Sequence, residues 1–341
     1  MDMVAYMGVI TEIDESDPQT IHRLVFEDLE RELPSTTYQE LTTGLGVRPK
    51  YKNDVAFYHQ HLTFFRVKPL YTWIAYGFHK IGFSLVDALL WVSLLSFIGI
   101  GLLFYFWIGK YMTPFLTFSV AVLTMLLSPV ADLARDITPD ALSNFFVLAT
   151  MYTYCYLHRG WLIFFLISAI LGRVDNFVLT GVIGFILIFE KTIFSIFSFS
   201  KPQSIDGRVV QKNEVGWGIA SILIGVVLFL IIPHLVGNTN EWLGKFSHTF
   251  SIKQYIYELM FSINAFRYSH FQLLLIIGII LLPLLKLFDR FEIKILLIIL
   301  LTMGGRLVLF PSFQDRFFIA YELMALIVLT RLMWRWNQSN N

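Results

Sequence analysis

Residues 161–189 read WLIFFLISAILGRVDNFVLTGVIGFILIF, and this stretch decides the class of fold. Two apolar runs, 161–171 and 177–189, flank the polar segment Gly172-Arg173-Val174-Asp175-Asn176. Each run is shorter than the roughly 20 apolar residues that a membrane-spanning helix needs. We therefore expect two half-length helices, or one broken helix, that meet at a polar point. Broken helices at membrane depth occur beside a cavity, so Arg173 and Asp175 are predicted to be functional, with an interfacial turn as the alternative.

Seven longer apolar runs lie on both sides of this stretch. They cover 83–109, 113–131, 140–157, 217–236, 271–287, 293–310 and 317–334. Apolar residues make up 56% of the 341 residues and charged residues only 15%, against about 25% in an ordinary soluble domain. One core of this length cannot bury so much apolar surface. The sequence predicts an all-α, polytopic transmembrane bundle over 83–334 and a polar tail at 335–341.

Several other classes of protein are excluded. Cys155 is the only cysteine, which rules out an intramolecular disulfide framework and a cysteine-based metal site. The net charge is +1 and no basic patch is interleaved with aromatic residues, so no nucleic-acid partner is expected. No phosphate-binding P-loop, dinucleotide-binding glycine motif or nucleophile elbow is present.

The N-terminal region differs from the rest of the chain. Residues 1–65 hold eleven Asp and Glu against five Lys and Arg, so this part is acidic and soluble in character. Apolar residues recur at 21, 25, 29 and 33 between Asp17-Pro18 and Pro34. This spacing predicts an amphipathic helix that starts after Asp17. We expect residues 1–82 to form an extracytoplasmic loop with amphipathic helices.

Alternating spans place five polar segments on the same side of the membrane as this loop. The segments are 66–71, 132–140, 173–176, 267–270 and 314–316. Convergence of Arg, Asp, Asn and His on one face suggests a polar chamber that binds an anion and exchanges a proton. Two alternatives remain open. Thr138-Pro139-Asp140 is also a good helix start, and Arg135 with Asp136 is equally compatible with a surface ion pair.

Five short motifs resemble those of the GT-C superfamily of integral-membrane glycosyltransferases. In chain order they are Asp2-Met3-Val4-Ala5-Tyr6, Arg66-Val67-Lys68-Pro69-Leu70-Tyr71, Thr138-Pro139-Asp140-Ala141-Leu142-Ser143, Gly172-Arg173-Val174-Asp175-Asn176 and Asp315-Arg316-Phe317-Phe318. Val174 stands where the family's turn has Pro. The order and spacing of the motifs cover most of the chain. In this family the first outer loop follows a transmembrane helix. We expect either that such a helix is encoded before Met1 or that the acidic N-terminal region is translocated without one.

The resemblance implies a function for these residues. Family members transfer a sugar from a polyprenyl-phosphate carrier to a lipid or glycan acceptor on the outer side of the membrane, here the outer side of a bacterial inner membrane. We expect Asp2 to act as the base, with Asp136 or Asp140 assisting it or holding a divalent metal, although no cofactor is clearly indicated. The candidates for binding the donor phosphate are Arg66, Lys68, Arg173 and Arg316. Further site candidates are Tyr6, Arg135, Asp175, Asn176 and His270.

Two other functions remain compatible with the sequence. A membrane transporter or a flippase for lipid-linked sugars would use the broken run at 161–189 as its gate. A non-catalytic membrane subunit that has kept the fold is the other alternative.

Overall fold

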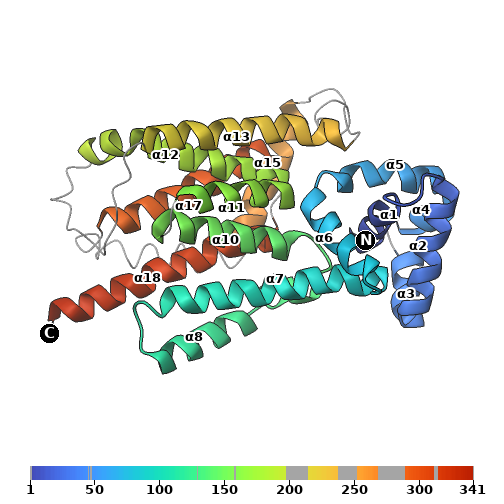
Figure 1. Cartoon of the computed structure of the whole chain (residues 1–341), viewed down its shortest axis with the longest axis horizontal. Coiled ribbons are helices and arrows are strands. Elements are labelled where there is room, and N and C mark those ends of the chain that lie inside the picture. Colours follow the sequence, from blue (N-terminus) through green and yellow to red (C-terminus); the bar gives the residue numbers. More distant parts are fainter. Residues whose placement is uncertain are drawn as a thin grey trace.

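Long apolar helices lie side by side and end at a group of shorter helices (Figure 1). The computed structural model describes residues 2–44, 46, 48–128, 130–156, 159–196, 214–236, 252–267, 289–310 and 314–340. These residues contain helices and no strand, so the all-α prediction is confirmed. The expected run at 271–287 lies outside the described residues.

The helices follow one another in this order. They are α1 (Asp2–Thr11), α2 (Pro18–Glu32), α3 (Ser35–Thr43), α4 (Arg48–Asn53), α5 (Val55–Arg66), α6 (Pro69–Lys80), α7 (Leu85–Ile108), α8 (Pro114–Leu126), α9 (Asp132–Arg135), α10 (Asp140–Tyr156), α11 (Arg159–Gly172), the 3₁₀ turn η1 (Val174–Asn176), α12 (Phe177–Ile196), α13 (Glu214–Leu235), α15 (Ile252–Arg267), α17 (Arg290–Leu309), the 3₁₀ turn η3 (Asp315–Phe317) and α18 (Ile319–Asn340).

Helices α1 to α6 form an N-terminal helical unit, and its core also includes residues from the start of α7 and Leu142 of α10. Helix α1 is its centre, because the side chains from Met3 to Ile10 are buried. The Tyr58 hydroxyl of α5 donates to the carbonyl of Val4 at 2.7 Å. The amphipathic helix predicted after Asp17 is confirmed as α2. Asp17 caps it, and the face that carries Ile21, Val25 and Leu29 is buried.

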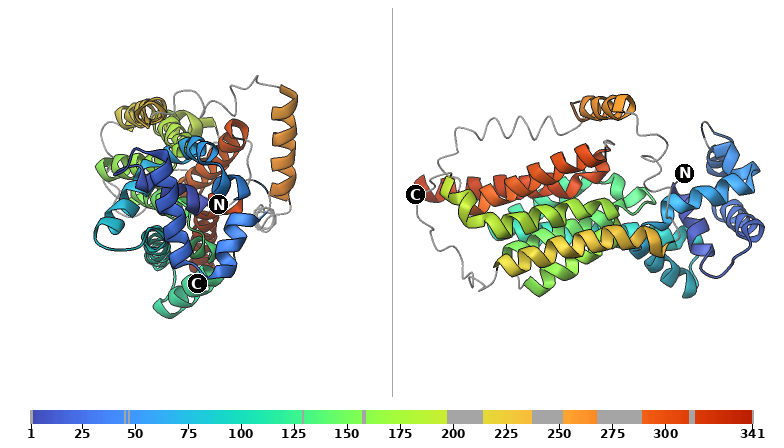
Figure 2. Two further views of the ribbon diagram at one scale, coloured as in Figure 1. Left: turned by 90° about the vertical axis from the view of Figure 1, so that its right-hand side faces the viewer. Right: turned by 90° about the horizontal axis from the view of Figure 1, so that it is seen from above.

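The remaining long helices form a bundle along the long axis of the molecule (Figure 1). Helices α10 and α11 pack as neighbours, as do α12 and α13, and α7 packs against α10. Helix α15 lies outside the bundle and crosses its direction (Figure 2). Two helices, α7 and α13, are long and apolar enough to cross a membrane by length and composition. A multi-pass topology beyond these two helices stays a prediction.

Three expected boundaries are wrong. The run predicted as a half-length helix at 177–189 is a 20-residue helix, α12, because the helix continues past Glu190. That charge is compensated, since Lys294 of α17 pairs with the Glu190 carboxylate. The polar tail expected at 335–341 is helical as far as Asn340, as the last turns of α18. The run expected at 113–131 contains only a 13-residue helix, α8.

Glycines allow α12 and α13 to approach closely. A Cβ atom on Gly184 would lie 2.6 Å from the carbonyl oxygen of Gly218, and one on Gly218 would lie 2.7 Å from that of Gly184. Real Cβ atoms do not come so near to a backbone oxygen, and a backbone cannot move as a flexible side chain can. The contact between the two helices therefore requires glycine at both positions.

Substitution of Gly184 by Ala is expected to destabilise the protein, by about 1–3 kcal/mol, because the methyl group forces the two helices apart. Gly181, one turn earlier in α12, has open space around its Cα. Gly181→Ala is the matched control and should leave stability unchanged or raise it, since Ala favours helix over Gly by roughly 1 kcal/mol. Thermal unfolding of the detergent-solubilised protein measures both. Equal melting temperatures for the two variants would contradict the close-contact explanation.

Candidate active site

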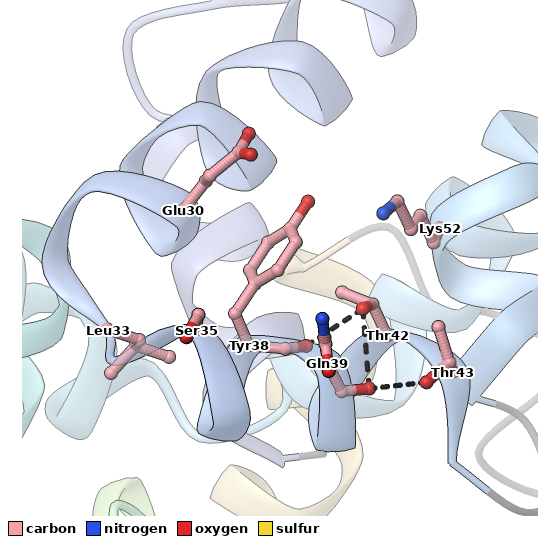
Figure 3. A pocket seen from close by; sticks show the side chains of 8 residues that line it. All are labelled: Glu30, Leu33, Ser35, Tyr38, Gln39, Thr42, Thr43 and Lys52. Carbon is pink, nitrogen blue, oxygen red and sulfur yellow. Dashed lines mark hydrogen bonds between the residues drawn. The ribbon is translucent and has the colours of Figure 1, made fainter.

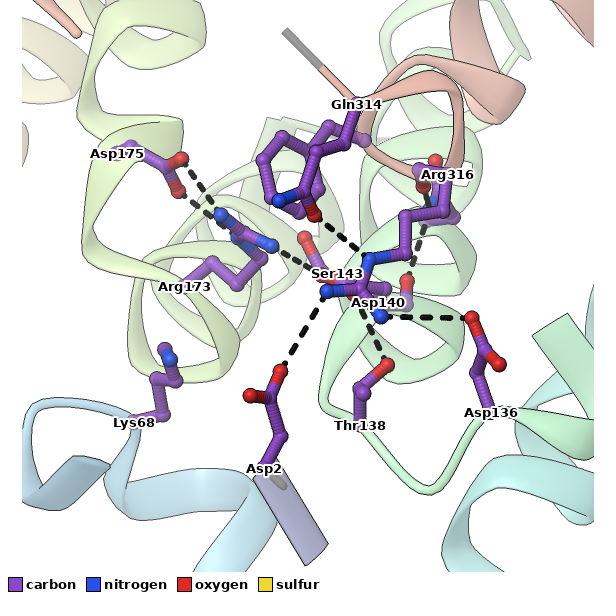
Figure 4. A network of polar contacts seen from close by, with 12 residues as sticks. Asp2, Lys68, Asp136, Thr138, Asp140, Ser143, Arg173, Asp175, Gln314 and Arg316 are labelled. Carbon is purple, nitrogen blue, oxygen red and sulfur yellow. Dashed lines mark hydrogen bonds and ion pairs between the residues drawn. The ribbon is translucent and has the colours of Figure 1, made fainter. Parts of the chain in front are cut away.

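A cluster of charged side chains lies where the bundle meets the N-terminal helical unit (Figure 4). Six elements contribute to it: the start of α1, the junction of α5 and α6, the start of α10 with the loop before it, the turn η1 with the residue before it, α17 and the turn η3. Turn η1 and the start of α10 come from polar interruptions between apolar helices. The cluster therefore sits at the end of the bundle helices, next to a unit rich in polar residues.

Asp140 is the central carboxylate of this cluster. Its side chain is 2% exposed. The Thr138 hydroxyl donates to Oδ2 at 2.9 Å, Arg316 Nε lies 3.0 Å from the same oxygen, and Arg173 pairs with Oδ1. Because three donors surround it, Asp140 is enclosed by hydrogen bonds and holds the two arginines in place.

Asp175 bridges two arginines from different elements. Arg173 donates to both carboxylate oxygens, at 3.2 and 3.1 Å, and Arg306 of α17 donates to Oδ2 at 2.5 Å. Burial acts to raise the pKa of Asp175, but the two guanidinium groups outweigh it and hold the pKa well below its usual range. Asp175 is therefore an anion that fixes Arg173 and Arg306 to each other.

The Phe317 ring lies against the same arginines. The guanidinium carbon of Arg173 is 3.8 Å from its centroid and that of Arg306 is 4.6 Å away. Arginine side chains over an aromatic face gain a cation–π attraction and lose freedom of rotation. Turn η3 thus supplies both Arg316 and the ring that orients the other two arginines.

Arg316 connects the bundle to the accessible carboxylates. Its Nη2 lies 3.4 Å from Asp2 Oδ2, and its Nη1 lies 3.4 Å from Asp136 Oδ2. These contacts are long, and the side chains of Asp2 and Asp136 are 39% and 42% exposed. The side-chain amide of Asn144 in α10 donates to the backbone carbonyl of Arg316 at 2.7 Å and so holds this residue in position. Asp2 and Asp136 are the carboxylates in the cluster that solvent or a substrate can reach.

Lys68 and Tyr6 bring the N-terminal helical unit into the cluster. Lys68 Nζ donates to the Tyr6 hydroxyl at 2.6 Å and lies 5.2 Å from the centroid of the same ring. Burial lowers the pKa of Lys68 to about 8, and repulsion by Arg173 acts in the same direction. Burial and the negative charge of Asp2 raise the pKa of Tyr6, which therefore stays a neutral phenol.

The structure brings together most of the residues expected at the site. Those that share the cluster are Asp2, Tyr6, Lys68, Asp136, Asp140, Arg173, Asp175 and Arg316. Asn176 is adjacent but has a structural role, because its amide donates to the Ser143 hydroxyl and to the Ala169 carbonyl.

Two expected residues, Arg66 and Arg135, make no ion pair with the cluster within the described part of the chain. Arg66 forms a two-pronged ion pair with Glu12, at 2.6 and 2.8 Å, so its guanidinium is occupied within the N-terminal helical unit. Arg135 forms no ion pair with a residue that the structure describes. His270 lies outside the described residues.

Arg306 was missed at the sequence level, although a signal was present. It is the only charged residue between Ile295 and Phe310 in the apolar run at 293–310. Burial of an ionisable side chain in such a run costs free energy unless an opposite charge lies beside it. Such a residue is therefore a candidate for a functional site. Its partner Asp175 is 131 residues away in the sequence, and nothing local predicts that pairing.

The cluster is electrically balanced. Four carboxylates, of Asp2, Asp136, Asp140 and Asp175, face four cations, of Lys68, Arg173, Arg306 and Arg316. Within the described part of the chain, no group of three or more His, Cys, Asp or Glu side chains is arranged to hold a metal ion. The arrangement can bind an anion on its cations and accept a proton on an exposed carboxylate.

Comparison with known proteins adds no relative. A scan against protein-family models, a search of curated proteins and a search of solved structures found no match.

Replacing Asp140 by Ala should destabilise the protein strongly, by about 3–5 kcal/mol, because two arginines lose a buried partner. Asp136→Ala removes the same charge from an exposed position with one long contact and should cost at most about 1 kcal/mol. The two variants form a matched pair for thermal unfolding. A similar loss of stability in both would show that Asp140 is not the buried anchor of the cluster.

Proposed function

We propose that this protein is an integral-membrane glycosyltransferase that moves a sugar from a polyprenyl-phosphate donor to an acceptor on the outer face of the membrane. One observation carries the proposal. An accessible carboxylate, Asp2, lies beside the cations Lys68, Arg173 and Arg316 at the end of long apolar helices. This is the set of groups that such a transfer needs. The resemblance of the five motifs to the GT-C superfamily supports the same assignment.

The proposal includes a multi-pass membrane topology. Helices α10, α11, α12, α17 and α18 run beside α7 and α13, the two helices that meet the length and composition expected of a span. Large apolar side chains point outward from α7 and α8, including Leu102 at 53% and Phe115 at 82% exposure. Such surfaces suit a hydrocarbon environment. With α7 upright in the bilayer, the charged cluster lies at the membrane surface on the side of the N-terminal helical unit.

The cations are assigned to the phosphate of the donor. Transfer breaks the bond between the anomeric carbon and the phosphate oxygen, and the electron pair leaves on the phosphate. Arginine matches phosphate oxygens through its fork of donors, and lysine adds a point charge. Arg306 donates to Asp175 and to the Phe317 carbonyl, so we assign contact with the phosphate to Arg316, Lys68 and Arg173.

Asp2 is assigned as the base. The acceptor hydroxyl forms the new bond to the anomeric carbon while its proton passes to the Asp2 carboxylate. Asp2 is exposed, whereas Asp140 is enclosed by donors and is therefore a positioning residue. Asp136 has an environment similar to that of Asp2 and is the second candidate for the base. Inversion at the anomeric carbon is implied by the resemblance alone.

The transporter alternative keeps only part of the observation that raised it. The turn η1 separates α11, of 14 residues, from α12, but α12 has 20 residues and is not a half-length helix. The polar turn η1 lies at the end of α11 and α12 that faces the N-terminal helical unit (Figure 4). Measurement of sugar transfer against flux into vesicles separates the two functions.

Replacement of Asp2 by Asn should lower the rate of sugar transfer by roughly 10²–10⁴-fold, the usual contribution of a general base. Binding of polyprenyl phosphate should be retained, because the cations remain. Asp54→Asn is the control: it removes one charge from the same unit, and Asn keeps the helix cap that Asp54 provides. The readout is transfer of radiolabelled sugar in proteoliposomes. Wild-type rates in Asp2→Asn would remove Asp2 from the mechanism.

The pKa of Lys68 predicts an alkaline limb in the pH profile. Protonated Lys68 attracts the donor phosphate. As the pH rises through the Lys68 pKa of about 8, the ammonium loses its proton and kcat/KM for the donor should fall. Arginine stays charged across this range, so Lys68→Arg should retain activity at higher pH and lose this limb. Tyr6 does not produce the limb, since its own pKa is raised. An unchanged limb in the Lys68→Arg variant would assign the titration to another group.

A further inference from the structure

A second polar site lies within the N-terminal helical unit, away from the charged cluster. A pocket of about 450 Å³ is bounded by the end of α2, by α3 and by α4. The Tyr38 ring stands at its centre, with Glu30 on one side and Lys52 on the other (Figure 3). Cavities of about 300–1,000 Å³ are typical of sites for small molecules.

Several polar groups that face this pocket are free to bind. Within the described residues, the Tyr38 hydroxyl, the Ser35 hydroxyl and the Gln39 side-chain amide have no hydrogen-bond partner. The hydroxyls of Thr42 and Thr43 donate to backbone carbonyls of α3 but keep lone pairs that can accept. The pocket therefore offers donors and acceptors at several points around one aromatic ring.

The charges of the pocket cancel. Glu30 supplies one carboxylate and Lys52 one ammonium, which lies 4.9 Å from the centroid of the Tyr38 ring. A pocket for an anion would need an excess of cations, and one for a cation would need the reverse. A neutral ligand with many hydroxyl groups fits better, because carboxylate, ammonium, amide and hydroxyl groups all bond to hydroxyls. The aromatic face and Leu33 suit its apolar C–H surface.

We propose that this pocket binds a saccharide unit. The inference rests on the proposed function and refines it: the acceptor is a glycan, and one of its sugar units is held in the pocket by the unit that also supplies Asp2 and Lys68. Tyr38 and Gln39 are the binding residues, the first through its ring and the second through its amide.

The test is direct binding of neutral disaccharides to the full-length protein in lipid nanodiscs. N,N′-Diacetylchitobiose, cellobiose, maltose and lactose serve as probes, and saturation-transfer-difference NMR reports contact and affinity. We expect at least one probe to bind. Tyr38→Ala and Gln39→Ala should each weaken it by about tenfold or more, as for other central contacts in a site. Gln19→Ala, an exposed glutamine at the other end of α2, is the matched control and should bind as wild type.

Two outcomes would overturn the proposal: no binding by any of the four disaccharides, or equal affinity in wild type and Tyr38→Ala. The transfer assay on the wild-type protein and on Asp2→Asn keeps the failures apart. If the wild-type protein transfers no sugar while the pocket variants lose the probe, the enzymatic proposal fails and the saccharide site stands. If the wild-type protein transfers sugar and Asp2→Asn does not, while the pocket binds no probe, the enzyme stands and the saccharide site fails.

Discussion

The buried arginines have to be paired, and this constraint organises the end of the bundle. Arg173 and Arg306 come from elements that are surrounded by apolar helices, where an uncompensated charge is very costly. Asp175 and Asp140 provide the compensation, and each contacts a partner from another part of the chain. The ends of α10, α11, α12 and α17 and the turn η3 are thereby fixed relative to one another by charge as well as by packing.

The same pairing distinguishes two kinds of carboxylate in the cluster. Some orient the buried arginines, and the others are exposed and can contact a substrate. Asp140 and Asp175 are enclosed by donors. Asp2 and Asp136 each make a long contact with Arg316 and face solvent. Arg316 therefore links the rigid inner pairs to the accessible outer carboxylates. A phosphate that binds at this point meets cations already oriented by the inner pairs, so little of the binding energy is lost in ordering side chains.

The sequence predicts the coarse organisation well, because it depends on local patterns. The all-α class and the amphipathic α2 follow from hydropathy and capping, and residues of the polar segments 66–71, 132–140, 173–176 and 314–316 meet in the charged cluster. The alternation of spans across a membrane stays a prediction. The predictions are wrong where a charged residue forms an ion pair with a residue that is distant in the sequence. Helix α12 extends through Glu190 because Lys294 neutralises it, and Arg66 is withdrawn from the expected phosphate site because Glu12 binds it. Arg306 has a local signal, but only the fold reveals Asp175 as its partner.

The most direct test of the central claim is a cryo-electron microscopy structure of the protein in a nanodisc with a polyprenyl-phosphate sugar bound. We predict density for the phosphate between Lys68, Arg173 and Arg316, with the sugar directed toward Asp2. Phosphate density at the opposite end of the bundle, near Arg331 and Arg335, would contradict the assignment of the charged cluster as the active site.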